Sequence, residues 1–271
     1  MVESLSNSYQ RPRRLRARSR LGKYRIEGLL ADGDYSNVYR AYDTIEGNRV
    51  ALKIPHPHLA DDAFLQGFRH EARLAAKIPH PRLLNLKDAS IIGGHFVLAY
   101  PLGVESLADR LTRRISRDNL SLFIDHCLEG LALLHQHRII HCDLKPENFI
   151  VFPGPSIRLA DFGIARLAIR TLQASGSGTP GYMAPEQAMG RPSCRSDVFA
   201  MGLLIYRMVA GHLPEYPFKW PPPASAKLRR KARPEFVALI RKALEVSPRR
   251  RFRDGDALYR AFRQIRKRAL Y

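Results

Sequence analysis

Cysteine is scarce in this sequence, which contains only Cys127, Cys142 and Cys194 among its 271 residues. None of them shows the CxxC spacing of zinc and dithiol motifs, and three are too few for a disulfide framework. This usage is typical of a protein from a reducing compartment, so we expect a cytoplasmic location.

Long apolar runs are missing as well. The most apolar stretch, residues 198–210, is shorter than the roughly 18 residues that a membrane-spanning helix needs, and Arg207 interrupts it. The first residues also lack the apolar core of a secretory signal. The sequence therefore predicts no transmembrane segment.

Acidic residues are few: the sequence has 25 Asp and Glu but 45 Lys and Arg, which gives a formal net charge of +20. The excess lies at the two basic ends, because residues 1–23 hold seven basic residues against one acid and residues 227–271 hold sixteen against four. Such ends are either a solvated surface or a site for nucleic acid, anionic lipid or an acidic protein. No aromatic residue lies among the arginines of 11–20, so base stacking is not indicated there.

The periodicity of the chain changes near residue 101. Residues 1–22 are polar and aperiodic, and we expect them to form a disordered basic leader. Strand patterns and one helical apolar stripe follow, and from about residue 102 helical patterns dominate. The predicted strands are 24–30, 38–42, 49–54, 91–92 and 96–99, then 149–152 and 157–160; the main predicted helices are 63–78, 120–134, 196–210, 235–244 and 256–265.

Two short segments carry residues suited to phosphoryl transfer. The first is His141-Cys142-Asp143-Leu144-Lys145-Pro146-Glu147-Asn148, and the second is Asp161-Phe162-Gly163. One carboxylate can accept a proton from a hydroxyl group, while an amide and a second carboxylate can hold Mg²⁺ against phosphate oxygens.

Together with Lys53 and Glu71, these segments resemble the signature set of the eukaryotic-type (Hanks-type) serine/threonine protein kinases, from about residue 24 to 266. The compact spacing is similar to that of bacterial members. The resemblance implies an α+β, two-lobed fold: a β-rich N-lobe over 23–101 with one key helix, and a mainly helical C-lobe over 102–271, forming one kinase domain over about 23–267. It also implies ATP with Mg²⁺, or alternatively Mn²⁺, and a protein substrate with a Ser or Thr acceptor.

The resemblance assigns roles by position. Asp143 matches the catalytic base and Lys145 the cation that steadies the transferring phosphate. Asn148 and Asp161 match the metal ligands. The implied nucleotide-binding residues are Leu30, Ala31, Gly33, Ser36, Val38, Ala51, Lys53, Leu98, Ala99, Tyr100, Asn148 and Asp161.

Lys53 matches the strand lysine that contacts the α- and β-phosphates. Glu71 falls on the apolar face of its predicted helix with Phe68 and Ala75, where a carboxylate needs a cation. Lys53 is the expected partner; the alternative is that Glu71 is an ordinary exposed residue.

Several further matches are structural. We expect Glu186 to pair with Arg251, Asp197 to accept hydrogen bonds from the catalytic-loop backbone, and His141 to pack under Phe162 rather than act as an acid or base. Thr179, at the end of the implied activation segment, would bridge Asp143 and Lys145.

The chain departs from the family pattern in two places. The phosphate loop keeps only Gly33 of the GxGxxG pattern, and Asp32 and Asp34 must point outward if ATP is to bind well. Cys142 stands where the family has an arginine before the catalytic aspartate, so this position offers no cation to bind a phosphate on the activation segment. We expect activity that does not depend on such phosphorylation.

Two alternatives stay open from the residues. The altered glycine loop favours a pseudokinase, a nucleotide-binding scaffold or regulatory module with little turnover. A small-molecule phosphotransferase would share the same lobes, although the segment 178–186 is typical of a platform for protein substrates.

Overall fold

The computed structural model describes residues 14–33, 35–56, 62–162, 181–214, 217–222 and 225–271, and for residues 62–64 it describes the backbone alone. The chain divides into two compact units. The first comprises residues 1–66 and 86–102, and the second comprises residues 67–85 and 103–271. The lobe bounds expected from the sequence, 23–101 and 102–271, stay a prediction; residues 67–85, which they place in the N-lobe, cluster with the helical unit.

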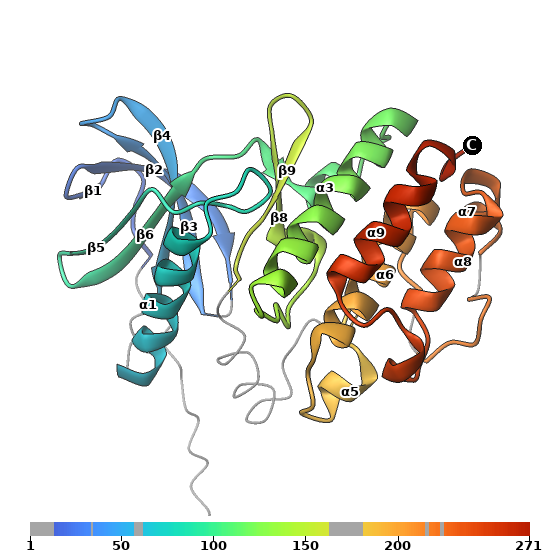
Figure 1. Ribbon diagram of the computed structural model, residues 1–271. Helices are drawn as coiled ribbons and strands as arrows, with labels where there is room; N and C mark the ends of the chain where they lie inside the picture. Colours follow the sequence, from blue (N-terminus) through green and yellow to red (C-terminus); the bar gives the residue numbers. More distant parts are fainter. Residues whose placement is uncertain (1–13, 34, 57–61, 163–180, 215–216, 223–224) are drawn as a thin grey trace, which may run out of the picture. The chain divides into compact units, whose positions relative to one another are not determined.

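An antiparallel sheet of six strands forms the first unit (Figure 1). Its strand order is β1-β2-β3-β4-β6-β5. Each strand therefore pairs with the next strand along the chain, except that β4 pairs with β6 instead of β5. The strands are β1 (Arg20–Leu21), β2 (Tyr24–Asp32), β3 (Ser36–Asp43), β4 (Asn48–Pro55), β5 (Asp88–Ile92) and β6 (His95–Pro101). Each predicted strand is present, and most are longer by one to three residues.

One face of this sheet is an apolar core. Alternate residues of β2, β3 and β4 point into it, as the period of two in a strand requires. The core residues are Leu21, Tyr24, Ile26, Tyr39, Ala41, Val50, Leu52, Ile54, Val97 and Ala99. Burial of each large apolar side chain stabilises the lobe by about 1.5–3 kcal/mol relative to exposure.

The end of the predicted leader is part of this sheet. Arg18 donates a backbone hydrogen bond to Ile26 at 2.8 Å, and β1 pairs with β2. Leu21 is buried and Leu15 packs against the core. Residues 14–22 are therefore structured, because two leucines in an Arg-rich segment are enough to anchor it; residues 1–13 lie outside the described part of the chain.

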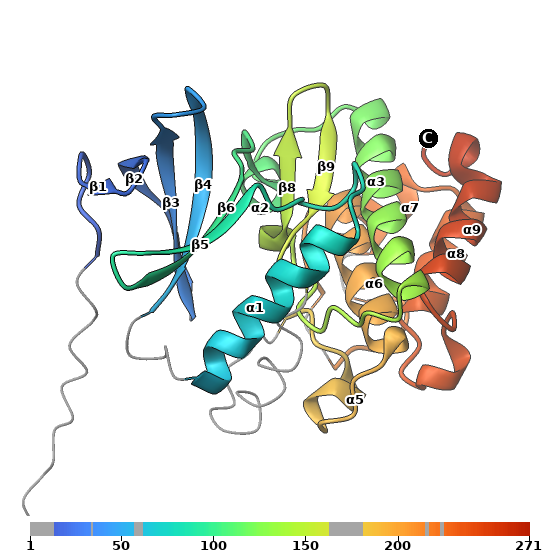
Figure 2. The same cartoon turned by 60° about the vertical axis from the view of Figure 1, so that its left-hand side comes forward.

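Helices dominate the second unit, and the helix α1 (Asp62–Lys77) continues into it from the first. Figures 1 and 2 show α3 alongside α6 and α9, with a small three-stranded sheet of order β7-β8-β9 next to α3. The other elements are β7 (Glu105–Ser106), α2 (Leu107–Arg110), α3 (Arg117–Gln136), β8 (Phe149–Phe152), β9 (Ser156–Leu159), α5 (Pro185–Ala188), α6 (Cys194–Ala210), α7 (Ala226–Lys231), α8 (Pro234–Ala243) and α9 (Gly255–Ile265). No helix within the described ranges is both long and apolar enough to cross a membrane.

The helix α6 is buried on nearly every side, as its sequence predicts. From residue 196 to 210 every side chain is buried except Arg207. Ser193 caps the start of the helix, and Gly211 ends it with φ at 81°, a left-handed conformation that glycine adopts without strain. A buried helix with fixed ends is a rigid base for the residues at its start.

The basic C-terminal end is folded. Eight of its sixteen Lys and Arg lie on α7, α8 and α9, on the solvent side of these helices. The backbone of Arg233 donates to Ala269 at 3.0 Å and that of Tyr271 donates to Lys231 at 2.9 Å. These bonds bring the basic end of α7 next to the basic residues 266–268.

Buried His126 of α3 should make stability depend on pH. Its side chain is 6% exposed, and Nδ1 accepts the backbone N–H of Ile157 at 3.3 Å. Burial, reinforced by the charge of Arg82, lowers the pKa of His126 from 6.5 to about 4. The unfolded chain therefore binds this proton more readily, so the stabilisation is complete above pH 6.5 and is lost as the pH falls toward 4.

We predict that His126→Asn, which keeps an acceptor but cannot titrate, removes part of this loss. Between pH 7 and pH 4 the unfolding free energy of the wild type should fall by about 1–3 kcal/mol more than that of the variant, as measured by urea unfolding. The exposed His137→Asn is the control and should follow the wild type. Parallel curves for wild type and His126→Asn would contradict the prediction.

Candidate active site

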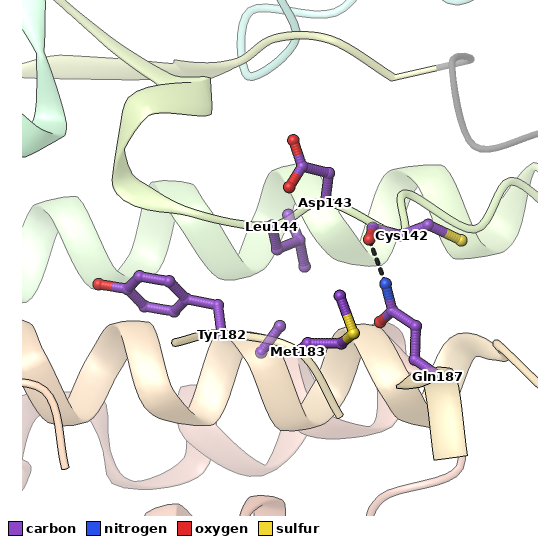
Figure 3. A pocket seen from close by; sticks show the side chains of 7 residues that line it. Cys142, Asp143, Leu144, Tyr182, Met183 and Gln187 are labelled. Carbon is purple, nitrogen blue, oxygen red and sulfur yellow. Dashed lines mark hydrogen bonds between the residues drawn. The ribbon is translucent and has the colours of Figure 1, made fainter. Parts of the chain in front are cut away.

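The candidate base Asp143 lies in the loop that follows α3, and its carboxylate is held from two sides. The Nζ atom of Lys145 is 2.9 Å from Asp143 Oδ2. The amide nitrogen of Asn148 donates to the carbonyl oxygen of Asp143 at 2.6 Å and to Oδ2 at 3.2 Å. Lys145 and Asn148 orient the Asp143 side chain, and its exposed fraction of 44% leaves it accessible to a substrate hydroxyl. In Figure 3 its carboxylate points away from Met183 and Gln187.

Lys145 is positively charged in this setting. Burial lowers the pKa of Lys145, but the charge and hydrogen bond of Asp143 outweigh burial, and the pKa is raised overall. An ammonium group held beside the candidate base can offset negative charge that builds up on a transferring phosphate.

The two candidate metal ligands are neighbours because of strand register. Phe149 of β8 pairs with Leu159 of β9, and Ala160 then donates its N–H to the carbonyl of Asn148 at 2.8 Å. Asp161 follows directly, with φ at 60°. A left-handed conformation is uncommon outside glycine and often marks a functional position.

The donor atoms fit a hard cation such as Mg²⁺. The hydrogen bonds of the Asn148 side chain to Asp143 use its nitrogen, which leaves the amide oxygen as a candidate metal ligand together with the Asp161 carboxylate. No group of three His, Cys, Asp or Glu side chains that could hold a metal occurs in the described ranges. A two-oxygen set suits an ion whose other ligands are water and phosphate.

Asp197, at the start of α6, supports the loop from below. Its Oδ2 accepts the backbone N–H of His141 at 2.7 Å, and its Oδ1 accepts that of Cys142 at 2.9 Å. These are the hydrogen bonds that the sequence predicted for Asp197. Asp197 is 1% exposed, so its carboxylate needs these hydrogen bonds in place of water, and the two backbone N–H groups in turn need the carboxylate as their acceptor.

His135 is a third partner of Asp197, and the sequence analysis missed it. Its Nδ1 accepts the N–H of Gly255 at 2.7 Å, so the other ring nitrogen, Nε2, donates to Asp197 Oδ2 at 2.9 Å. The neutral ring thus links the start of α9 to the start of α6. The only signal in the sequence is a polar residue on the buried face of α3, which does not reveal its partners.

His141 uses both ring nitrogens on the backbone. Its Nδ1 accepts the N–H of Asp143 at 3.3 Å, and Nε2 therefore donates to the carbonyl of Ala160 at 2.9 Å. The residue is 1% exposed. These contacts support the predicted structural role, since no ring nitrogen is left for acid–base work.

Glu186 and Arg251 form the predicted ion pair. Two parallel hydrogen bonds of 2.7 and 3.0 Å join the guanidinium to the carboxylate, and the Arg251 side chain is fully buried. Burial raises the pKa of Glu186, but the hydrogen bonds from Arg251 and Ser196 outweigh it and lower the pKa overall. The pair fixes the start of α5 beneath the catalytic loop.

In the first unit, register gathers the candidate nucleotide-binding residues on one face of the sheet. Val38 lies opposite Lys53, and Lys53 lies opposite Leu98. Directly paired residues point to the same face, and so do residues two apart along a strand. The residues on this face are Ala31, Ser36, Val38, Ala51, Lys53, Leu98 and Tyr100.

Other candidates are placed differently. Ala99 points to the opposite face, into the core, which leaves only its backbone for a ligand. Leu30 lies at an irregularity of β2 and is 49% exposed. Lys53 and Glu71 are 5% and 2% exposed, so the alternative of an exposed Glu71 is wrong; their mutual pairing stays a prediction.

The glycine loop is braced by His56, another residue that the sequence analysis missed. Its backbone N–H donates to Tyr35 at 3.0 Å, and its Nε2 donates to the carbonyl of Gly33 at 2.8 Å. A Cβ on Gly33 would lie 3.1 Å from the Ser36 carbonyl oxygen, so glycine suits this tight turn. Asp32 forms an ion pair with Arg14 of the basic N-terminal end, which offsets its charge near the loop.

Some predicted residues lie outside the described part of the chain. They are Asp34, Gly163, Thr171, Ser175, Ser177 and Thr179. Their assigned roles stay predictions.

Comparison with known proteins agrees with this geometry. Residues 24–262 match the family model "Protein kinase domain". The chain is 32% identical over 272 residues to "Serine/threonine-protein kinases drp72" of Corynebacterium efficiens, which covers 90% of this chain and 51% of that protein. It is 33% identical over 200 residues to the serine/threonine-protein kinase PknL of Mycobacterium tuberculosis, which covers 71% of this chain and 50% of that protein.

Solved structures show the same fold. The PknI kinase domain of Mycobacterium tuberculosis superposes with a TM-score of 0.69 at 26% identity, covering 93% of this chain and 99% of that one. The apo form of PpkA-294 gives a TM-score of 0.77 at 22% identity, covering 92% and 99%. The chain spans about half the length of the curated relatives it matches. These findings show that the chain belongs to the Hanks-type protein kinase family and has its two-lobed α+β fold.

Proposed function

We propose that this chain is a serine/threonine protein kinase that transfers the γ-phosphate of Mg-ATP to Ser or Thr hydroxyls of a protein. The observation that carries the proposal is the Asp143 carboxylate, which Lys145 and Asn148 hold in place while leaving it accessible. The kinase relatives at 30–37% identity support the reaction class. Its three free thiols fit a reducing cytoplasm.

In the proposed reaction Asp143 accepts the proton of the substrate hydroxyl as its oxygen forms a bond to the γ-phosphorus. The bond to the β,γ-bridging oxygen breaks, and ADP leaves. Lys145 offsets the charge on the transferring group, and Lys53, for which the sequence predicts Glu71 as partner, orients the α- and β-phosphates. Mg²⁺ on Asn148 and Asp161 would balance the charge of the phosphates.

Two other functions have less support. A pseudokinase scaffold gives no reason for an oriented base, a charged Lys145 beside it and a pair of adjacent oxygen donors. A small-molecule phosphotransferase gives no reason for the resemblance of residues 178–186 to a protein-substrate platform.

The first test is transfer of labelled phosphate from ATP with Mg²⁺ to generic protein substrates. Asp143→Asn should lower kcat by about 10²–10⁴-fold, because the amide cannot accept the proton. Lys53→Met should also abolish most transfer. Asp118→Asn, on the exposed start of α3, is the matched control. Wild-type activity no higher than that of Asp143→Asn, with Mn²⁺ also tried, would favour the pseudokinase.

Activity should not require phosphorylation of the activation segment. A phosphate there acts through a cation, and the position before Asp143 is a buried thiol. The joint replacement of Thr171, Ser175 and Ser177 by alanine should change kcat/KM by less than about twofold in a peptide assay. A large loss would show that one of these hydroxyls is needed.

We also propose that the basic ends attract a polyanion. Exposed cations of α7 and of residues 266–268 are gathered at one place by the backbone bonds between 231–233 and 269–271. Among the described residues, Arg230, Lys231, Lys267 and Arg268 form no ion pair. Unpaired cations close together bind phosphates with a strong dependence on salt.

Replacement of Arg230, Lys231, Lys267 and Arg268 by serine should weaken binding to DNA or to anionic vesicles at least about tenfold at low salt. Activity on a peptide should persist. The matched control removes four other exposed charges of the same unit, Arg73, Lys77, Arg191 and Lys219. Equal losses in both variants would mean that only net charge matters, and unchanged binding would remove this cluster from the proposal.

A further inference from the structure

We infer that Gln187 is a positioning residue that orients Asp143 by holding the peptide group between Cys142 and Asp143. The inference rests on the proposed function and adds a part to its machinery. The side-chain nitrogen of Gln187 donates to the carbonyl oxygen of Cys142 at 2.5 Å, and the two residues are 5% and 6% exposed (Figure 3).

This peptide group is held at both ends. Gln187 binds its carbonyl oxygen, and Nδ1 of His141 accepts its N–H, which belongs to Asp143, at 3.3 Å. A peptide group is planar, so fixing both polar atoms fixes the plane. The Cα atom of Asp143 lies in that plane, so the point from which its side chain leaves the backbone is fixed as well. The hydrogen bonds from Asn148 to the carbonyl oxygen and Oδ2 of Asp143 then restrict the remaining rotation.

Cys142 needs this support because its backbone is strained. Its φ is 64°, a left-handed value that residues with a side chain rarely adopt. Such a conformation persists only where the surroundings hold it. Asp197 binds the N–H of Cys142 and Gln187 binds its carbonyl, so two side chains of the second unit clamp the strained residue from opposite sides.

Gln187 is itself rigid. It follows Glu186 in α5, and the ion pair of Glu186 with buried Arg251 fixes that turn. The Gln187 side of the clamp is neutral: burial raises the pKa of the Cys142 thiol, so the thiol carries no charge, and the amide of Gln187 cannot titrate. The catalytic loop is thus aligned without a charged group at the position before Asp143.

The first variant is Gln187→Leu, which keeps the approximate size but cannot donate. Its kcat should fall at least about tenfold while the KM for ATP changes little, because Asp143 is misplaced and the nucleotide residues are untouched. Amide hydrogen exchange of residues 141–144 should become faster. The melting temperature of the variant is measured as well: a value close to that of the wild type shows that the loss of kcat is not caused by unfolding.

The second variant, Gln187→Glu, tests the donor within one folded protein. The titratable groups nearest to residue 187 are Cys142, Asp143 and Tyr182, which line the same hollow. Asp197 and His141 lie further away, and Asp197 binds the backbone N–H groups of His141 and Cys142. A buried carboxyl among these acids has a raised pKa. Protonated, it can donate to the Cys142 carbonyl; ionised, it repels it. The kcat of this variant should therefore fall reversibly as pH rises through the new titration, a limb that the wild type lacks.

Gln264→Glu, exposed on α9, is the matched control and should keep the wild-type pH profile. A Gln187→Leu variant with kcat within about twofold of the wild type, or a Gln187→Glu variant without the new limb, would overturn the inference. If the wild type itself transferred no phosphate, the proposed function would fail. The amide hydrogen exchange of residues 141–144 would then test the role of Gln187 without any activity measurement, and an unchanged exchange rate in Gln187→Leu would overturn the inference.

Discussion

The arrangement of the catalytic loop depends on one buried carboxylate. Asp197 accepts two backbone N–H groups of the loop and one imidazole N–H, at 2.7 to 2.9 Å. A buried charge without partners would be very unfavourable, so the loop and the carboxylate require each other. Since Asp197 starts the most deeply buried helix, the loop is in effect attached to the centre of the C-lobe.

The site therefore combines two kinds of support. Charged contacts lie where charge is useful, as in Lys145 beside Asp143 and Arg251 on Glu186. The backbone of the loop, by contrast, is held by buried groups: Asp197 accepts two of its N–H groups, His141 accepts the N–H of Asp143, and Gln187 binds the carbonyl of Cys142. Salt screens buried contacts little, so the geometry stays constant while the strongly basic surface responds to ionic conditions.

The sequence predicted most of what depends on side-chain chemistry at fixed spacing. Asp143, Lys145 and Asn148 lie together with Asp161 close by along the chain, and Glu186 pairs with Arg251 as expected; Thr179 is outside the described residues. The strand patterns also gave the sheet, because alternation and turn residues are local properties.

What the sequence did not predict depends on backbone partners far along the chain. His135 reaches Gly255, Gln187 reaches Cys142 and His56 reaches Gly33, and a backbone atom has no residue-specific signature. The structured part of the leader was missed for a related reason. Leu21 and Leu15 are too few to form a pattern, and only the sheet they meet makes them core residues.

The link through His135 has a consequence for dividing the domain. The N–H of Gly255 is the donor that leaves Nε2 of His135 to face Asp197, so α9 helps to set the tautomer of a ring buried beneath the catalytic loop. A fragment cut between α8 and α9 would lose more than the packing of a terminal helix. Without that donor the ring can carry its proton on Nδ1 and present a lone pair to a carboxylate, so a domain boundary drawn before residue 255 would disturb the loop from about 120 residues away in sequence.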